Sequence, residues 1–299
     1  MEIKKIIIIG AGFMGSGIAQ VLASAKFEVV LRDITDELAK KGFSAVEKNL
    51  IASEAKGKLP EQEKAAILSR IKLATTLESA KDCDLVIEAI VERKEDKMDL
   101  FRQLDAICPA EVIFATNTSS IPITELATAT KRSANVVGMH FFSPAPVMKL
   151  VEIIRGLKTS DETVEVIRNL TEKIGKVGVL VKDGPGFLVN RINAALRSEV
   201  YNCLAEGVAS IEDIDKAIKF GLGHPMGPLE LQDLVGLEIG LAVMETLWEN
   251  FREPKWRPAL ILRKLVASGD LGRKTGKGWY DYTSGEKKVR TDILLYADA

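Results

Sequence analysis

The sequence predicts an α/β protein with a Rossmann-type, largely parallel sheet, an antiparallel extension of that sheet, and an all-α C-terminal domain. Apolar, β-rich runs alternate with helical segments up to about residue 181, which is typical of βαβ units. A glycine-rich turn follows the first of these runs. After the chain-breaking segment 182–186, only long helical patterns remain.

The order of these segments predicts two domains, an α/β domain over 1–183 and a helical domain over 184–299. The expected strands are 6–9, 27–32, 84–89, 112–116, 136–140, 150–154 and 177–181. The expected C-terminal helices are 187–206, 210–220, 229–251 and 258–268. The stretch 229–244 has more apolar residues than one helix face needs, so we expect it to be buried, in part between subunits.

Composition excludes several classes of function. The formal net charge is −1, so no global field favours nucleic acid or an anionic membrane. Three scattered cysteines and two distant histidines cannot form the usual first shell of a metal site. The apolar run near the N-terminus is too short for a signal peptide, which makes the cytoplasm the expected location.

The first strand leads into the pattern Gly10-x-Gly12-x-x-Gly15, and Asp33 ends the next strand. Gly10 permits a tight turn, Gly12 lets the backbone approach a pyrophosphate, and Gly15 allows close packing of the following helix. The amides at the start of that helix favour an anion. An acid at position 33 would bind the adenine ribose hydroxyls and repel a 2′-phosphate, so the spacing predicts NAD as cofactor.

His140 ends one apolar run, and Glu152 lies in the next. Pro144 and Pro146 force a reversal between them, and the connection is too short for a parallel crossover. Two antiparallel strands would bring the imidazole beside the carboxylate. Such a pair suits a general acid and base working near neutral pH, although a lone histidine at a strand end is commonly structural.

Several motifs together resemble the L-3-hydroxyacyl-CoA dehydrogenase family, and most closely its bacterial 3-hydroxybutyryl-CoA members. The motifs are the glycine turn with Asp33, the NTSS run 117–120, HFFSPAP at 140–146, KLVE at 149–152, GPGFLVNR at 184–191, HPMGPL at 224–229 and GRKTGKGWY at 272–280. The resemblance implies an NAD-dependent, dimeric enzyme that interconverts (S)-3-hydroxyacyl-CoA and 3-oxoacyl-CoA.

The resemblance also assigns residues. It implies that His140 is the catalytic base and Glu152 its orienting partner, and that Ser119 and Asn190 contact the substrate near the reacting carbon. It implies that Lys56 contacts CoA. The residues that it places at the cofactor are Gly10, Gly12, Phe13, Met14, Gly15, Asp33, Glu92, Lys97, Asn117, Ser119, Ser143 and Lys274. Ala52 and Ser143 depart from relatives that carry lysine and asparagine there, which affects CoA contact and acyl preference.

Two alternatives remain open at this point. The same fold could oxidise free hydroxy acids, sugar acids or dicarboxylic hydroxyacyl-CoA esters, since no residue fixes acyl length or terminal charge. Alternatively, the chain could be a redox-inactive, NAD-binding structural protein. The presence of Ser119, His140, Glu152 and Asn190 together argues against the inactive alternative.

Overall fold

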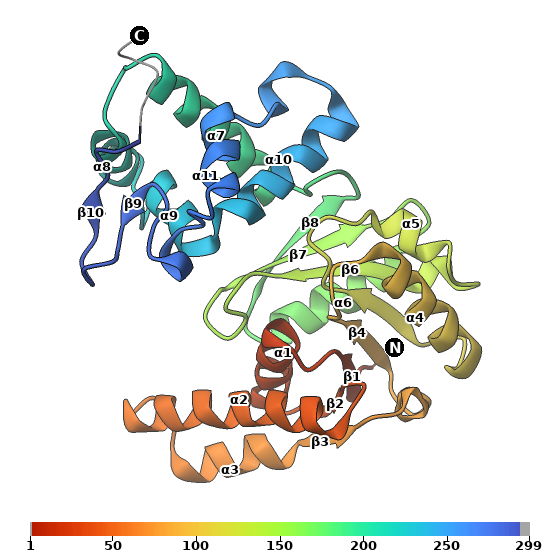
Figure 1. The fold of residues 1–299 in the computed structure, drawn as a ribbon. Coiled ribbons are helices and arrows are strands. Elements are labelled where there is room, and N and C mark those ends of the chain that lie inside the picture. The colour runs from red at the N-terminus through yellow and green to blue at the C-terminus, as the bar shows by residue number, and fades with distance from the viewer. Residues whose placement is uncertain (1, 294–299) are drawn as a thin grey trace. The chain divides into compact units, whose positions relative to one another are not determined.

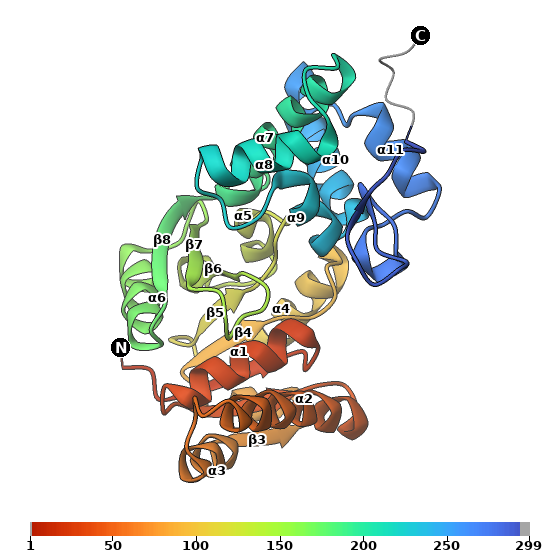
Figure 2. The same ribbon diagram turned by 90° about the vertical axis from the view of Figure 1, so that its left-hand side faces the viewer.

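The structure is a computed structural model that describes residues 2–293, and these divide into two compact units between Phe187 and Leu188. The first unit is an eight-stranded sheet with helices on both faces, and the second is mainly helical (Figures 1 and 2). Within the described residues, no helix combines the length and the apolar character needed to cross a membrane.

The sheet has the strand order β3-β2-β1-β4-β5-β6-β7-β8. Strands β1 to β6 are parallel, β7 is antiparallel to β6, and β8 is parallel to β7. This confirms the predicted parallel sheet and its antiparallel extension. The bounds are β1 Lys5–Ile9, β2 Glu28–Arg32, β3 Ile71–Ala74, β4 Leu85–Glu88, β5 Ile113–Thr116, β6 Val136–Phe141, β7 Leu150–Arg155 and β8 Val177–Lys182.

Helices cover both faces because the central strands are apolar on both sides. Four of the five residues of β1 are fully buried isoleucines, which alternate between the two hydrophobic cores. One face packs against α1 (Phe13–Ser24), α2 (Asp36–Ala55), α3 (Glu61–Ser69) and α6 (Asp161–Lys173). The other packs against η1 (Leu77–Ala80), α4 (Lys94–Ile107) and α5 (Ile123–Ala127). Between β5 and β6 lies the short turn η2 (Ser133–Asn135).

The order of strands reverses between β1 and β4. The chain leaves β1 toward one face of the sheet, through α1, and leaves β4 toward the other face, through α4. In open α/β sheets, this is the point at which ligands bind, beyond the carboxyl ends of the strands. The glycine turn follows β1 at this edge.

The second unit contains α7 (Val189–Ala205), α8 (Ile211–Gly221), α9 (Pro228–Val235), α10 (Leu237–Phe251) and α11 (Leu260–Ala267), with η3 (Pro254–Trp256) and η4 (Arg273–Thr275). The prediction of one helix over 229–251 is wrong. Gly236, with φ 114°, ends α9 and starts α10. A left-handed backbone angle of this kind interrupts the helical hydrogen bonds, and glycine adopts it at little cost.

The helical unit also contains a small hairpin that the all-α prediction lacked. It consists of β9 (Tyr280–Asp281) and β10 (Lys288–Val289). The hairpin is fastened to α9 by Asp233, whose carboxylate accepts hydrogen bonds from the backbone amides of Trp279 (2.8 Å) and Tyr280 (2.9 Å). Buried amides require such acceptors, so Asp233 explains how a segment with little regular structure stays packed on the helices.

Candidate active site

The glycine turn joins β1 to α1 and contains no side chain larger than a methyl group between Gly10 and Gly12. Gly10 has φ +103°, and a Cβ there would lie 2.5 Å from the carbonyl oxygen of Ala89. A Cβ on Gly15 would lie 1.8 Å from the carbonyl oxygen of Gly10. These two positions therefore exclude side chains for steric reasons, whereas a Cβ on Gly12 would meet no atom within 4 Å.

The open space at Gly12 lies at the N-terminus of α1, where the first backbone amides have no acceptor within the helix. The first turn of α1 has no acidic residue that would repel an anion. Phe13 is exposed and Met14 partly exposed at this end of the helix. The turn therefore has the space, the donors and the dipole that a pyrophosphate requires.

Asp33 follows β2 and is hydrogen-bonded to the glycine turn. Its Oδ2 accepts from the Ala11 amide (2.8 Å) and its Oδ1 from the Ile34 amide (2.7 Å). Each carboxylate oxygen can accept a further hydrogen bond, so Asp33 can still bind ribose hydroxyls. The neighbouring Arg32 donates from Nε to the carbonyl of Thr75 (3.1 Å). The residues at this edge of the sheet thus fit NAD.

His140 and Glu152 face each other across the antiparallel pair of β6 and β7, where they are in register. The distance from His140 Nδ1 to Glu152 Oε2 is 2.8 Å. The imidazole is 8% exposed, and the carboxylate is fully buried. Because Nδ1 faces a carboxylate, the neutral ring carries its proton there and leaves Nε2 as the basic nitrogen.

Two aromatic rings border the imidazole. The ring centroids of Phe142 and Phe187 lie 4.7 Å and 5.7 Å from that of His140. Apolar walls limit the access of water and strengthen the attraction between the carboxylate and a protonated ring. The arrangement has the parts of a general acid and base that is held in one orientation.

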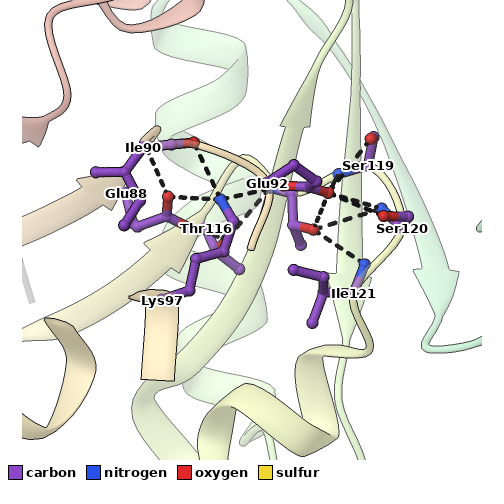
Figure 3. Close-up of polar contacts among 9 residues, drawn as sticks. Glu88, Ile90, Glu92, Lys97, Thr116, Ser119, Ser120 and Ile121 are labelled. Carbon is purple, nitrogen blue, oxygen red and sulfur yellow. Dashed lines mark hydrogen bonds and ion pairs between the residues drawn. The ribbon is translucent and has the colours of Figure 1, made fainter. Parts of the chain in front are cut away.

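A polar turn follows β5 and contains Asn117 and Ser119. Figure 3 shows Ser119 in this turn. The Oδ1 of Asn117 accepts a hydrogen bond from the Phe141 amide (2.9 Å), which ties the turn to the residue after His140. Ser119 is partly exposed, and its Oγ lies 3.4 Å from Glu92 Oε1. The turn is therefore anchored both to β6 and to the loop after β4.

Glu92 and Lys97 form part of a connected polar network on the carboxyl side of β4. The distance from Lys97 Nζ to Glu92 Oε2 is 3.2 Å. Burial of the Glu92 carboxyl favours its neutral form, but the charge of Lys97 and hydrogen bonds from Thr118 and Ser119 outweigh burial and lower the pKa of Glu92. Glu92 is therefore an anion at neutral pH.

The remaining predicted site residues of the first unit lie outside this cluster. Lys56 is exposed at the C-terminal cap of α2, with Ala52 one turn earlier, and Ser143 is exposed in the connection between β6 and β7. Asn190 and Lys274 belong to the second unit. Asn190 is partly exposed in the first turn of α7, and Lys274 contacts Glu238.

Sequence reasoning missed Glu88 and Thr116, the last residues of β4 and β5. Both are fully buried, and the distance from Thr116 Oγ1 to Glu88 Oε2 is 2.5 Å. The signal for Glu88 was present, because it is a lone carboxylate within an apolar strand. A buried carboxylate requires a partner, and the sequence does not show which residue supplies it.

Comparison with known proteins agrees with this geometry. Residues 5–184 match the NAD binding domain of 3-hydroxyacyl-CoA dehydrogenase, and residues 186–282 match its C-terminal domain. A probable 3-hydroxybutyryl-CoA dehydrogenase from Bacillus subtilis is 49% identical over 282 residues, which cover 94% of this chain and 98% of that protein. A 3-hydroxyadipyl-CoA dehydrogenase from Escherichia coli is 41% identical and covers 97% of this chain, which corresponds to 61% of that longer protein.

Among solved structures, (S)-3-hydroxybutyryl-CoA dehydrogenase from Ralstonia eutropha superimposes with a TM-score of 0.92 at 48% sequence identity, over 94% of this chain and 100% of that one. The glycine turn, the sheet order and both domain matches indicate the same family. The chain therefore belongs to the 3-hydroxyacyl-CoA dehydrogenase family and is an NAD-dependent enzyme of that type.

Proposed function

We propose that the enzyme interconverts (S)-3-hydroxyacyl-CoA and 3-oxoacyl-CoA, with 3-hydroxybutyryl-CoA and acetoacetyl-CoA as its preferred pair. The observation that carries the proposal is the buried His140–Glu152 contact of 2.8 Å at the carboxyl end of β6. The relatives named 3-hydroxybutyryl-CoA dehydrogenase support the short acyl chain.

In the oxidative direction, Nε2 of a neutral His140 takes the proton of the C3 hydroxyl. Bound NAD would supply the acceptor for the hydride that leaves C3. Glu152 stabilises the imidazolium that forms, because its carboxylate lies 2.8 Å from Nδ1. In the reductive direction, the imidazolium returns the proton to the oxygen on C3.

Ser119 and Asn190 are proposed to bind the substrate oxygen near C3, with Ser119 also touching the nicotinamide side of the cofactor. Both have hydrogen-bonding side chains that are partly exposed. The other proposed cofactor residues are Gly10, Gly12, Phe13, Met14, Gly15, Asp33, Glu92, Lys97, Asn117, Ser143 and Lys274.

For the CoA portion, we propose Lys56 as a ligand of the nucleotide phosphates, since it is exposed at the end of α2. A pocket of about 370 Å³ lies between the glycine turn, α2 and the Pro144–Pro146 segment, and Lys41 and Asn49 are among its lining residues. Gly12 and Asp33 also line this pocket, so we assign it to the cofactor, and Lys56 lies outside its lining. Ala52, one turn before Lys56 on the same helix, supplies no cation.

A second candidate substrate is a dicarboxylic hydroxyacyl-CoA, because the 3-hydroxyadipyl-CoA dehydrogenase relative is 41% identical over nearly the whole chain. The two candidates differ only in the distal end of the acyl chain. The His140 chemistry is the same for both.

The test is optical measurement of NADH oxidation with acetoacetyl-CoA, 3-oxoadipyl-CoA, longer 3-oxoacyl-CoA esters and free acetoacetate. We expect the largest kcat/KM with acetoacetyl-CoA. A larger value with 3-oxoadipyl-CoA would select the dicarboxylic substrate. Turnover of free acetoacetate at the same rate would remove the CoA requirement, and NADH binding without turnover of any substrate would indicate an inactive protein.

Asp33→Ala is expected to lower the preference for NADH over NADPH by about tenfold, because it removes a charged hydrogen-bond acceptor for the ribose and its repulsion of a 2′-phosphate. The measurement is the ratio of kcat/KM for the two cofactors. Asp36→Ala is the matched control, since it removes a nearby exposed carboxylate at the start of α2. Equal losses with both cofactors would mean that Asp33 serves only to hold the glycine turn.

We also propose that the enzyme is a homodimer through its helical unit. Leu234, Val235 and Ile239 are 51%, 42% and 48% exposed where α9 meets α10, although they are apolar. Adjacent exposed apolar side chains of this kind commonly mark an interface. The stretch 229–244 is thus only partly buried within one chain, and we propose that a partner subunit covers the exposed part.

Ile239→Glu is expected to convert the dimer to monomers in size-exclusion chromatography with light scattering, because a carboxylate cannot be buried there without a partner. Asn250→Glu, which adds the same charge at an exposed polar position of α10, should leave the dimer intact. An unchanged dimer for Ile239→Glu would place the interface elsewhere.

A further inference from the structure

The network in Figure 3 begins at Glu88, a carboxylate that is fully buried at the carboxyl end of β4. Its Oε1 accepts hydrogen bonds from Lys97 Nζ (2.6 Å) and the Ile90 amide (2.7 Å). Its Oε2 accepts one from Thr116 Oγ1 (2.5 Å). A buried carboxylate is stable only when it is compensated in this way, so Glu88 fixes the positions of all three donors.

Lys97 is as deeply buried as Glu88, with its side chain 1% exposed. Its ammonium has three hydrogens, and three acceptors surround it: Glu88 Oε1 (2.6 Å), Glu92 Oε2 (3.2 Å) and the Ile90 carbonyl (3.4 Å). This set uses the full donor capacity of the side chain. Lys97 is therefore placed to hold Glu92, so its proposed part in cofactor binding is exerted through Glu92.

Glu92 divides its two oxygens between Lys97 and the turn after β5. Its Oε2 faces Lys97, and its Oε1 accepts from the backbone amides of Ser119 (2.9 Å) and Ser120 (3.2 Å) and from Thr118 Oγ1 (2.6 Å). A glutamate that is 38% exposed would otherwise sample several rotamers. The ion pair with Lys97 selects the one that holds the turn.

A second connection leads from Glu88 to the same turn. Thr116 Oγ1 donates to Glu88 Oε2 and accepts a hydrogen bond from the Thr118 amide (3.2 Å). Glu88 is thus connected to the Ser119 turn by two routes. One runs through the side chains of Lys97 and Glu92, and the other runs through Thr116, which directly precedes the turn in the sequence. On its other side, the turn is tied to β6 by the contact between Asn117 and Phe141, beside His140.

We propose that Glu88 is a positioning residue for the dehydrogenase reaction: through Lys97 and Glu92, it fixes the turn that carries Ser119. The inference rests on the proposed function, because the role of Ser119 in binding substrate and cofactor belongs to that proposal. According to this proposal, Glu88 contacts neither the substrate nor the cofactor. Its effect on turnover passes entirely through the geometry of the turn.

A purely structural role for Glu88 makes a different prediction, and the double variant Glu88→Leu/Lys97→Met separates the two. Removing one member of a buried ion pair leaves an uncompensated charge, whereas replacing both members by apolar side chains of similar size commonly restores stability. The double variant therefore recovers the fold but cannot hold Glu92. Glu125→Gln is the control, since it removes the half-exposed ion pair with Lys94 from the same region.

The full-length variants would be compared in three measurements: thermal unfolding, kcat and KM for acetoacetyl-CoA with NADH, and hydrogen exchange of the segment 117–121. We expect the double variant to unfold at a higher temperature than Glu88→Leu alone. Its kcat should remain at least about tenfold below that of the wild type, because small displacements of positioning groups carry large kinetic costs. Amide exchange at Ser119 and Ser120 should be faster, while Glu125→Gln should match the wild type.

Recovery of kcat together with thermal stability would overturn the proposal, since Glu88 would then serve the fold alone. A low kcat with unchanged exchange at Ser119 and Ser120 would also overturn it. If the double variant does not fold, Glu88→Gln provides the same kinetic and exchange comparison with a smaller perturbation. If the wild type does not reduce acetoacetyl-CoA, the proposed function fails, and the exchange measurement still decides whether Glu88 holds the turn.

Discussion

Replacement of His140 by alanine is expected to reduce turnover at least about 100-fold, which is the usual scale of general acid and base assistance. NADH binding should be retained. The imidazole is the basic group that Glu152 orients at the end of β6, at 2.8 Å from Nδ1 to Oε2. Its removal leaves the glycine turn and Asp33 untouched. The measurement is kcat for acetoacetyl-CoA reduction, together with NADH affinity from fluorescence titration.

His224→Ala is the matched control for this experiment. It removes the other histidine of the chain, which is exposed in the second unit between α8 and α9. This variant should retain wild-type turnover. If His140→Ala also retained it, the proton would have to be transferred by another group, and the His140–Glu152 contact would be structural.

Much of the first unit could be predicted from the sequence because its signals are local and redundant. The apolar run of β1, the glycine turn and Asp33 each follow from the requirements of a buried parallel strand that leads into a helix. The pairing of β6 with β7 was predictable for another reason. Their connection is too short for a parallel crossover, so only an antiparallel arrangement is possible.

Elements with weaker local signals escaped prediction. β3 is a four-residue edge strand, buried at Ile71 but exposed at Lys72, and its pattern differs little from that of a loop. The break at Gly236 lies within a continuous apolar stretch, where glycine is tolerated in a helix and the positive φ is decided by packing. The hairpin β9–β10 depends on Asp233, which is distant in sequence.

The candidate site shows the same division. The pairing of His140 with Glu152 follows from strand register, which the sequence constrains. The orientation of Lys97 does not, because a glutamate and a lysine five residues apart at the start of a helix are usually solvated. The structure instead turns Lys97 inward toward Glu88, a contact between β4 and α4 that depends on tertiary packing.

Glu152→Gln is expected to lower turnover at least about 100-fold, because the amide keeps the size of the side chain but loses the charge that stabilises the imidazolium. Glu152 is fully buried, so its replacement could also disturb the fold. Thermal unfolding and NADH affinity are therefore measured on the same preparation. Glu162→Gln, an exposed position in the first turn of α6, is the control for loss of a carboxylate and should leave turnover unchanged.

A double-mutant cycle with His140→Ala distinguishes the ways in which Glu152 could act. If Glu152 works only through the imidazole, Glu152→Gln should change the residual turnover of His140→Ala by no more than about twofold, because residues that act as a unit are strongly non-additive. An equal loss in both backgrounds would mean that Glu152 stabilises the sheet or contacts a ligand independently of His140. The cycle thus assigns the effect of a buried carboxylate to the chemistry or to the fold, a distinction that neither single variant can make.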